Sequence, residues 1–104
     1  FDVLSPAPLR ALKTLVKAAK KYKVPVTVCG EMAGRPIEAM TLIGLGLRSV
    51  SMAPASIGPV KAMILSLNAE KITDCVDALL KEGAKDVRLH LQQFAEKEGV
   101  EIDG

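Results

Sequence analysis

Two short apolar runs, about residues 25–30 and 47–52, constrain the fold more than any other feature of the sequence. The core of the first run, Val26 to Cys29, is rich in β-branched residues and is followed at once by Gly30, which is typical of a buried strand. Each run comes after a stretch with helical spacing of its apolar residues. Strands that alternate with helices pair in parallel, so the sequence predicts an α/β layout.

Five helices are expected around these strands. The first begins at Ser5-Pro6 and ends before Pro25, and the second begins at Pro36 and ends near Gly44. A loop is expected over residues 54–58. A helical tail follows over residues 59–99, in three segments: about 59–67, one capped by Asn68 and ended by Gly83, and one ending at Gly99.

Two parallel strands cannot cover both their faces and both their edges. Residues 1–104 are therefore expected to pack with copies of the same chain or to form part of a larger sheet. The first residue is Phe1 rather than Met, which favours a piece of a longer protein.

The composition excludes several classes of function. The net charge is +2, with acidic and basic residues mixed, and the lysines over residues 17–23 are read as a solvated helix face, so neither a nucleic-acid nor a membrane partner is expected. No apolar run is long enough to span a membrane. Cys29 and Cys75 match no metal-binding or disulfide spacing, which favours a reducing, cytoplasmic location.

Cys29 is the first candidate for chemistry, because it ends a predicted strand just before a glycine-rich loop. Ligands of parallel α/β folds bind at that end of the strands, where a thiol can act as nucleophile or general acid. Core packing is the competing interpretation, since free cysteine is commonly buried. Glu31 could orient a substrate or tune the thiol, with a plain surface carboxylate as its alternative.

The remaining candidates carry weaker signals. Cys75 lies on the apolar face of a predicted helix and is interpreted as core packing. His90, the one histidine, is predicted to be structural and partly buried. Ser51 and Ser56 follow the second strand, where barrels often hold a phosphate, but only their position supports that role. No set of metal ligands is recognised.

Residues 28–34, Val-Cys-Gly-Glu-Met-Ala-Gly, resemble the motif near the C-terminus of Enzyme I of the sugar and nitrogen phosphotransferase systems. Residues 44–57 are similar to that family's last barrel strand and its loop, and the likeness covers about residues 1–67. The related phosphoenolpyruvate synthases and pyruvate phosphate dikinases share the Cys-Gly pair, but their following residues usually differ from those here. The Gly34-Arg35-Pro36 step departs from the sugar-type pattern and favours the nitrogen-related branch.

This resemblance implies the C-terminal fragment of a (β/α)8 TIM barrel that binds phosphoenolpyruvate and Mg²⁺, with the Mg²⁺ ligands outside this chain. The phosphoryl group would pass to an enzyme histidine and on to a phosphocarrier protein of the HPr kind. Cys29 would donate a proton to enolpyruvate and so release pyruvate, with Gly30 and Glu31 as weaker members of the substrate loop. The parent would be a homodimer, and the fragment alone is expected to be inactive.

Other interpretations stay open at this point. The chain could be a structural or dimerisation module without catalysis of its own, or the C-terminal part of a related phosphoenolpyruvate synthase or pyruvate phosphate dikinase. A thiol redox enzyme is disfavoured, because no second cysteine lies near Cys29 in the sequence and no CxxC motif occurs.

Overall fold

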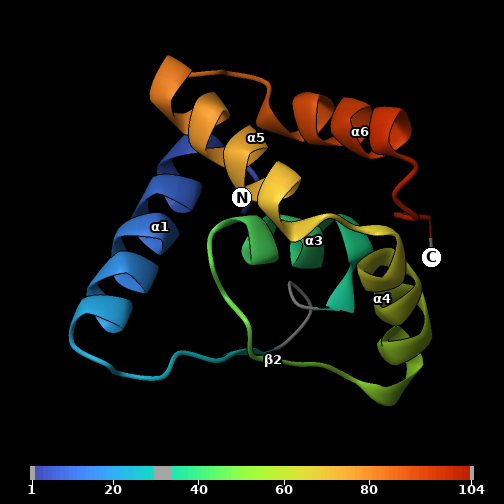
Figure 1. Ribbon diagram of the computed structural model, residues 1–104, viewed down its shortest axis with the longest axis horizontal. Helices are drawn as coiled ribbons and strands as arrows, with labels where there is room; N and C mark the ends of the chain where they lie inside the picture. The colour runs from blue at the N-terminus through green and yellow to red at the C-terminus, as the bar shows by residue number, and fades with distance from the viewer. Residues whose placement is uncertain (1, 30–33, 104) are drawn as a thin grey trace.

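The computed structural model describes residues 2–29 and 34–103, which form a small, mostly helical domain (Figure 1). Its elements in chain order are α1 (Pro6–Lys21), β1 (Val28–Cys29), α3 (Pro36–Gly44), β2 (Val50–Ser51), α4 (Pro54–Ser66), α5 (Ala69–Glu82) and α6 (Val87–Glu98). None of the helices in the described ranges is long and apolar enough to cross a membrane.

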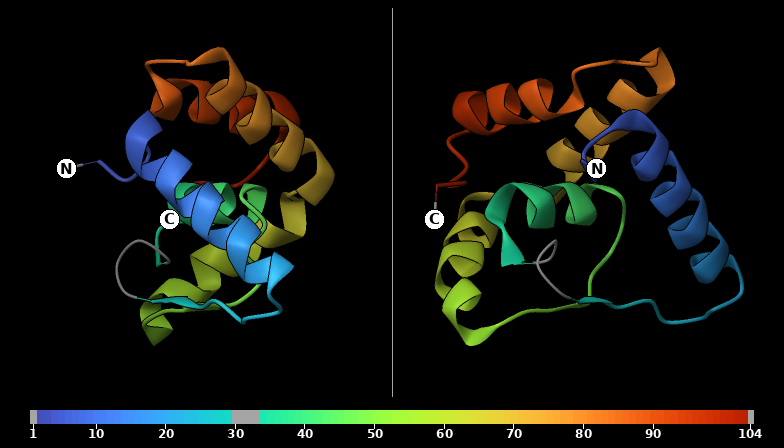
Figure 2. Two further views of the ribbon diagram at one scale, coloured as in Figure 1. Left: turned by 90° about the vertical axis from the view of Figure 1, so that its left-hand side faces the viewer. Right: turned by 180° about the vertical axis from the view of Figure 1, so that it is seen from behind.

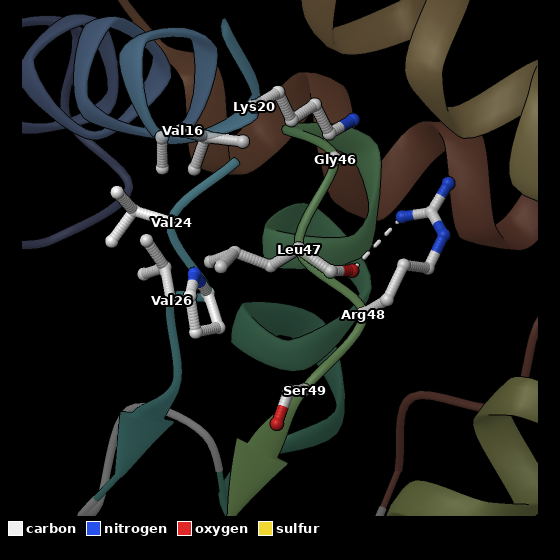
Figure 3. A pocket seen from close by; sticks show the side chains of 10 residues that line it. Val16, Lys20, Val24, Val26, Gly46, Leu47, Arg48 and Ser49 are labelled. Carbon is white, nitrogen blue, oxygen red and sulfur yellow. Dashed lines mark hydrogen bonds between the residues drawn. The ribbon is translucent and has the colours of Figure 1, made fainter. Parts of the chain in front are cut away.

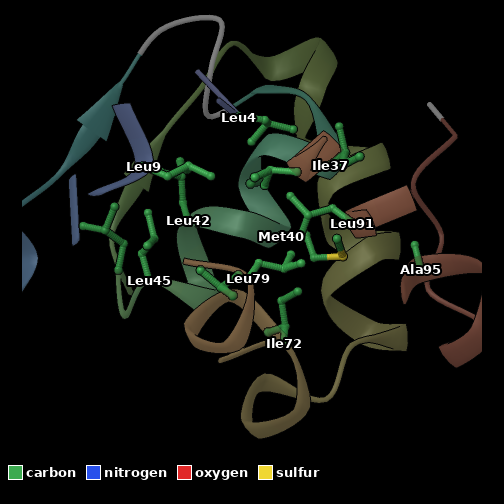
Figure 4. Close-up of a cluster of buried hydrophobic side chains, with 14 of the residues drawn as sticks. Leu4, Leu9, Ile37, Met40, Leu42, Leu45, Ile72, Leu79, Leu91 and Ala95 are labelled. Atoms are coloured by element: carbon green, nitrogen blue, oxygen red, sulfur yellow. The ribbon is translucent and has the colours of Figure 1, made fainter. Parts of the chain in front are cut away.

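Helix α3 is the centre of the domain. Helices α5 and α6 lie on one side of it and the strand pair lies on the other, as the views of Figures 1 and 2 agree. Almost every α3 residue is buried, including Met40 at 0% exposure. Helix α3 itself carries apolar side chains on nearly all sides, so other helices must cover all of them. The core therefore forms around α3, with side chains from α1, α4, α5 and α6 (Figure 4).

Gly44 allows α3 and α5 to approach each other closely. A Cβ atom at this position would lie 2.8 Å from Val76 Cγ2 and 3.1 Å from the Ile72 carbonyl oxygen. Any side chain there would push α5 away. The glycine that ends the predicted second helix therefore also serves the packing of the core.

The C-terminal helices follow the predicted local signals. Asn68 Oδ1 accepts a hydrogen bond of 3.0 Å from the Lys71 backbone N–H, which confirms the predicted cap of α5. Gly83 and Gly99 end α5 and α6 with φ of 70° and 67°, a left-handed conformation that glycine adopts without strain. The first helix and α3 also begin and end close to the predicted residues.

The two strands pair in parallel, as the helix–strand alternation predicts, with Val28 opposite Val50 and Cys29 opposite Ser51. They are much shorter than the predicted runs of about 25–30 and 47–52, with two residues each. Thr27, within the run predicted to be a buried strand, is exposed, so that expectation is wrong at this residue, and Ser51 of the second strand is exposed as well. Within residues 2–29 and 34–103 no third strand flanks the pair to extend its ladder.

Helix α4 begins at Pro54, so residues 54–58 form a helical turn and the predicted loop is wrong. Pro54 occupies the first turn, where its missing N–H costs nothing. Pro59, the predicted start, lies inside the helix and removes one backbone hydrogen bond. Pro54 and Pro59 could each begin a helix, and α4 begins at Pro54, the earlier of the two.

Candidate functional site

The strand pair places the backbone of Cys29 at the carboxyl end of β1, beside Ser51 of β2. This is the end at which parallel strands present ligand-binding residues. The structure describes the backbone of Cys29, whereas Gly30 and Glu31 of the predicted substrate loop lie outside the described residues. The predicted position of Cys29 at a strand end is confirmed, and the roles of all three residues stay predictions.

Two contacts hold the strands together just before this end. The Val28 backbone N–H donates to the Ser49 carbonyl oxygen at 3.4 Å, and the hydroxyls of Thr27 and Ser49 are 3.0 Å apart. Val28 packs against the core, whereas Thr27 faces solvent, because successive side chains of a strand point to opposite faces. One face of β1 is thus fixed by the core.

The segments that follow the two strands meet again at Gly34 and Ser56. A Cβ atom on Gly34 would lie 2.8 Å from Ser56 Oγ, so a larger residue at position 34 would displace the Ser56 hydroxyl in the first turn of α4. Ser56 is partly buried and Ser51 is exposed. Cys29 and Gly34 are therefore both anchored, Cys29 by its pairing with β2 and Gly34 by its contact with α4.

A cluster of charged side chains lies at the start of α3, and sequence reasoning missed it. Arg88 Nη2 lies 3.1 Å from Glu38 Oε1 and 2.8 Å from Asp2 Oδ1. Hydrogen bonding to Arg88 lowers the pKa of Asp2 to about 2, and the same bond raises the pKa of Arg88. Glu38 was the detectable signal, as a single acid inside an otherwise apolar helix.

His90 is exposed, which makes the prediction of a partly buried histidine wrong. Its Nδ1 atom lies 2.7 Å from the Asp86 carbonyl oxygen, and the Asp86 carboxylate accepts the Leu89 backbone N–H at 3.3 Å. His90 therefore belongs to the first turn of α6. Its ring faces solvent because Val87 and Leu91 occupy the side of α6 that the core covers.

Cys75 is partly buried on α5 and packs against the core, as the sequence predicts. Burial raises the pKa of its thiol. A raised pKa keeps the thiol protonated and unreactive near neutral pH. Cys75 is thus a suitable control for any experiment on Cys29.

The opposite end of the strands carries an apolar pocket (Figure 3). Its walls are aliphatic side chains from α1 and from the segments that lead into the strands, and its rim carries the cations Lys20 and Arg48. Arg48 Nη1 donates to the carbonyl oxygens of Ile43 and Leu47 at 2.8 and 2.9 Å. Arg48 thereby satisfies the C-terminal end of α3, so its role here is structural.

The described residues contain no group of three or more His, Cys, Asp or Glu side chains able to hold a metal ion. The acids nearest the start of α3, Asp2 and Glu38, are both bonded to Arg88. Metal chemistry by a ligand set within the described ranges is therefore not supported by the donors present.

Residues 1–69 match the family model of the PEP-utilising enzymes' PEP-binding domain. Over 81 residues, or 78% of this chain, it is 43% identical to a phosphoenolpyruvate-protein phosphotransferase of Cupriavidus necator. Over 96% of this chain it is 36% identical to a Salmonella typhimurium protein named phosphoenolpyruvate-dependent phosphotransferase system. A phosphoenolpyruvate-protein phosphotransferase of Mycoplasma pneumoniae is 32% identical over 98% of it. The chain spans 14%, 14% and 18% of the lengths of these three relatives.

Proposed function

This chain belongs to the family of PEP-utilising enzymes, through their PEP-binding domain, and on that basis we propose that it is part of a phosphoenolpyruvate-protein phosphotransferase. In the intact parent it would supply the last two strands of a (β/α)8 barrel together with their helices. The parallel pairing of β1 and β2 supports this placement, and so do the relatives' names and the small share of their length that the chain spans.

The parent's reaction begins with phosphoryl transfer from phosphoenolpyruvate to a histidine of the same enzyme. The bond between phosphorus and the enol oxygen breaks, a bond between phosphorus and nitrogen forms, and enolpyruvate remains. The phosphoryl group then passes to a phosphocarrier protein. His90 is not proposed as the acceptor, because its Nδ1 lies against the Asp86 carbonyl oxygen of its own helix turn.

Cys29 is proposed as the acid that completes the reaction. Its S–H bond breaks and a C–H bond forms at the methylene carbon of enolpyruvate, which gives pyruvate, and the thiolate takes a proton back from water. An ordinary cysteine pKa of about 8.5 suits a donor that must be protonated near neutral pH. The observation that carries this proposal is the register of the sheet, which pairs Cys29 with Ser51 at the carboxyl ends of the strands.

Magnesium is the cofactor that this reaction implies, but the described residues do not fit a magnesium site. Mg²⁺ requires several oxygen ligands with octahedral geometry. Glu38 and Asp2 bond to Arg88, and no cluster of acids is left for a metal within the described ranges. Magnesium ligands are therefore proposed to lie in other parts of the parent, and the chain alone is proposed to be inactive.

A second candidate function is subunit association, by which the chain would help to make a homodimer of the parent. Large apolar side chains stand exposed on α1 and α4, among them Leu15 at 53% and Leu65 at 78% exposure. Exposed aliphatic residues of this size are typical of surfaces that a neighbouring segment or subunit covers. Light scattering of the chain at high concentration tests this function, which a stable monomer would exclude.

The catalytic proposal is tested by pyruvate release from the full-length protein with phosphoenolpyruvate, Mg²⁺ and a phosphocarrier present. Cys29→Ala is expected to slow the release by roughly 10²–10⁴-fold, the usual contribution of a general acid. Cys75→Ala is the matched control and is expected to keep the wild-type rate. A wild-type rate in Cys29→Ala would exclude Cys29 as the acid of the limiting step.

A further inference from the structure

The charged cluster at the start of α3 joins three segments that are far apart in the sequence. Arg88 of α6 reaches Asp2 with two nitrogen atoms, at 2.8 and 3.1 Å, and reaches Glu38 at 3.1 Å. The Glu38 side chain is only 3% exposed. We call Asp2, Glu38 and Arg88 the Arg88 cluster. It fixes α6 and the N-terminal segment to the first turn of α3.

Packing alone does not explain why this cluster exists. An apolar side chain at position 38 would avoid the desolvation of a carboxylate, and buried ion pairs commonly stabilise a fold less than apolar residues of the same shape. Glu38 Oε2 is also buried without a hydrogen-bond partner among the described residues. A buried pair of this kind is better suited to fix one arrangement of the elements than to add stability.

The Arg88 cluster fixes the start of α3, and α3 comes after Cys29 in the sequence. The chain that leaves β1 at Cys29 reaches α3 through Gly34 and Arg35. Arg35 Nη1 lies 3.6 Å from Glu38 Oε1, and Gly34 packs tightly against Ser56. The start of α3 is therefore held on one side by α4 and on the other by α6, through Arg88.

We propose that Arg88 is a positioning residue, which acts through Glu38 to set the start of α3 and thereby the geometry in which Cys29 works. The chemical consequence rests on the proposed function of Cys29, whereas the positional consequence does not. Helix α6 lies outside the residues that match the family model, so this arrangement adds a contribution of the C-terminal helices to the site.

The positional part is tested on the full-length protein by the rate at which iodoacetamide alkylates Cys29, measured by peptide mass spectrometry. Arg88→Met is expected to change this rate several-fold, because the start of α3 loses its anchor. Val87→Ala is the matched control: it removes methyl groups from a neighbouring buried residue, 2% exposed, on the same helix. It is expected to lower the melting temperature and leave the alkylation rate unchanged.

The chemical part is tested by the kinetics of pyruvate release. Arg88→Met is expected to lower kcat roughly tenfold or more with KM nearly unchanged, as misplacement of a reacting group does. Arg88→Lys, which retains the positive charge, is expected to restore part of the loss. Wild-type alkylation and wild-type kcat in Arg88→Met would overturn the positioning role.

The experiments also distinguish two other outcomes, a variant that does not fold and a failure of the proposed function of Cys29. If Arg88→Met does not fold, the double variant Glu38→Gln with Arg88→Met, which leaves no unpaired buried charge, takes its place. A wild-type alkylation rate in that double variant would likewise overturn the proposal. If Cys29→Ala releases pyruvate at the wild-type rate, the proposed function fails, and the alkylation rates still decide whether Arg88 positions the start of α3.

Discussion

Helices α3 and α5 pack against each other, yet they are stabilised in opposite ways. Helix α5 carries its own signals, with Asn68 as N-cap, Gly83 as left-handed C-cap and a single apolar face. Helix α3 follows Arg35, has no Ser, Thr, Asn or Asp at its capping position, and is buried on nearly all sides. At its C-terminal end, the Gly46 backbone N–H and the Arg48 side chain both donate to the Ile43 carbonyl oxygen, at 2.9 and 2.8 Å.

This difference separates local from tertiary stabilisation. A helix with its own caps forms where its sequence dictates, whereas a helix buried on all sides exists because its neighbours enclose it. Helix α3 also follows the proposed catalytic residue. The part of the chain nearest the proposed chemistry is therefore the part that depends most on the rest of the domain.

The largest expected effect breaks the core around α3. Met40 has 0% exposure, and Met40→Ala is expected to lower the free energy of unfolding by about 2–5 kcal/mol, from lost burial and the cavity left behind. Leu65→Ala, at a side chain 78% exposed, is the control and should change it little. Urea denaturation followed by circular dichroism measures both. Equal losses would mean that α3 is not the centre of the core.

A smaller effect tests whether α5 depends on its own cap. Asn68→Ala removes the acceptor of the Lys71 N–H and is expected to cost about 1 kcal/mol of unfolding free energy. Asn68→Ser keeps an oxygen able to cap, and should stay close to wild type in the same denaturation experiment. If alanine and serine behave alike at this position, packing rather than the cap decides where α5 begins.

The smallest expected effect concerns pH and the Arg88 cluster. Because the pKa of Asp2 falls from 3.8 to about 2 on folding, its carboxylate stabilises the fold above about pH 4, and this contribution is lost as the pH falls towards 2. Asp2 is half exposed, so Asp2→Asn should cost only about 0.2–1 kcal/mol at pH 7, and nothing near pH 2. Glu96→Gln, at an exposed acid of α6, is the control in a denaturation series across this pH range. A loss in Asp2→Asn that does not change with pH would contradict the ion-pair account.

Sequence reasoning succeeded where the signal is local. Asn68 and Gly83 predict both ends of α5, and Pro36 predicts the start of α3, because each residue acts on its own backbone. It failed where the outcome depends on distant partners. The strands are shorter than predicted because a longer ladder requires further flanking strands, and the described residues supply none. The start of α4 was missed because Pro54 and Pro59 could each begin a helix locally.

In the candidate site too, features with a local signal were predicted and features that depend on distant residues were not. The position of Cys29 at a strand end follows from the β-branched run before it, and the register confirms that position. The Arg88 cluster could not be predicted, since Asp2, Glu38 and Arg88 are ordinary charged residues until the fold brings them together. The one sign of it in the sequence was Glu38, as a single acid within a helical stretch that is otherwise largely apolar.

The most direct test of the catalytic role separates the two steps of the proposed reaction. In a single turnover of the full-length protein, phosphorylated protein and pyruvate are measured in the same quenched samples for the wild type, Cys29→Ala and Cys75→Ala. The account predicts that Cys29→Ala becomes phosphorylated at close to the wild-type rate while its pyruvate formation lags, and that Cys75→Ala matches the wild type in both. Pyruvate formation that keeps pace with phosphorylation in Cys29→Ala would contradict the assignment of Cys29 as the proton donor.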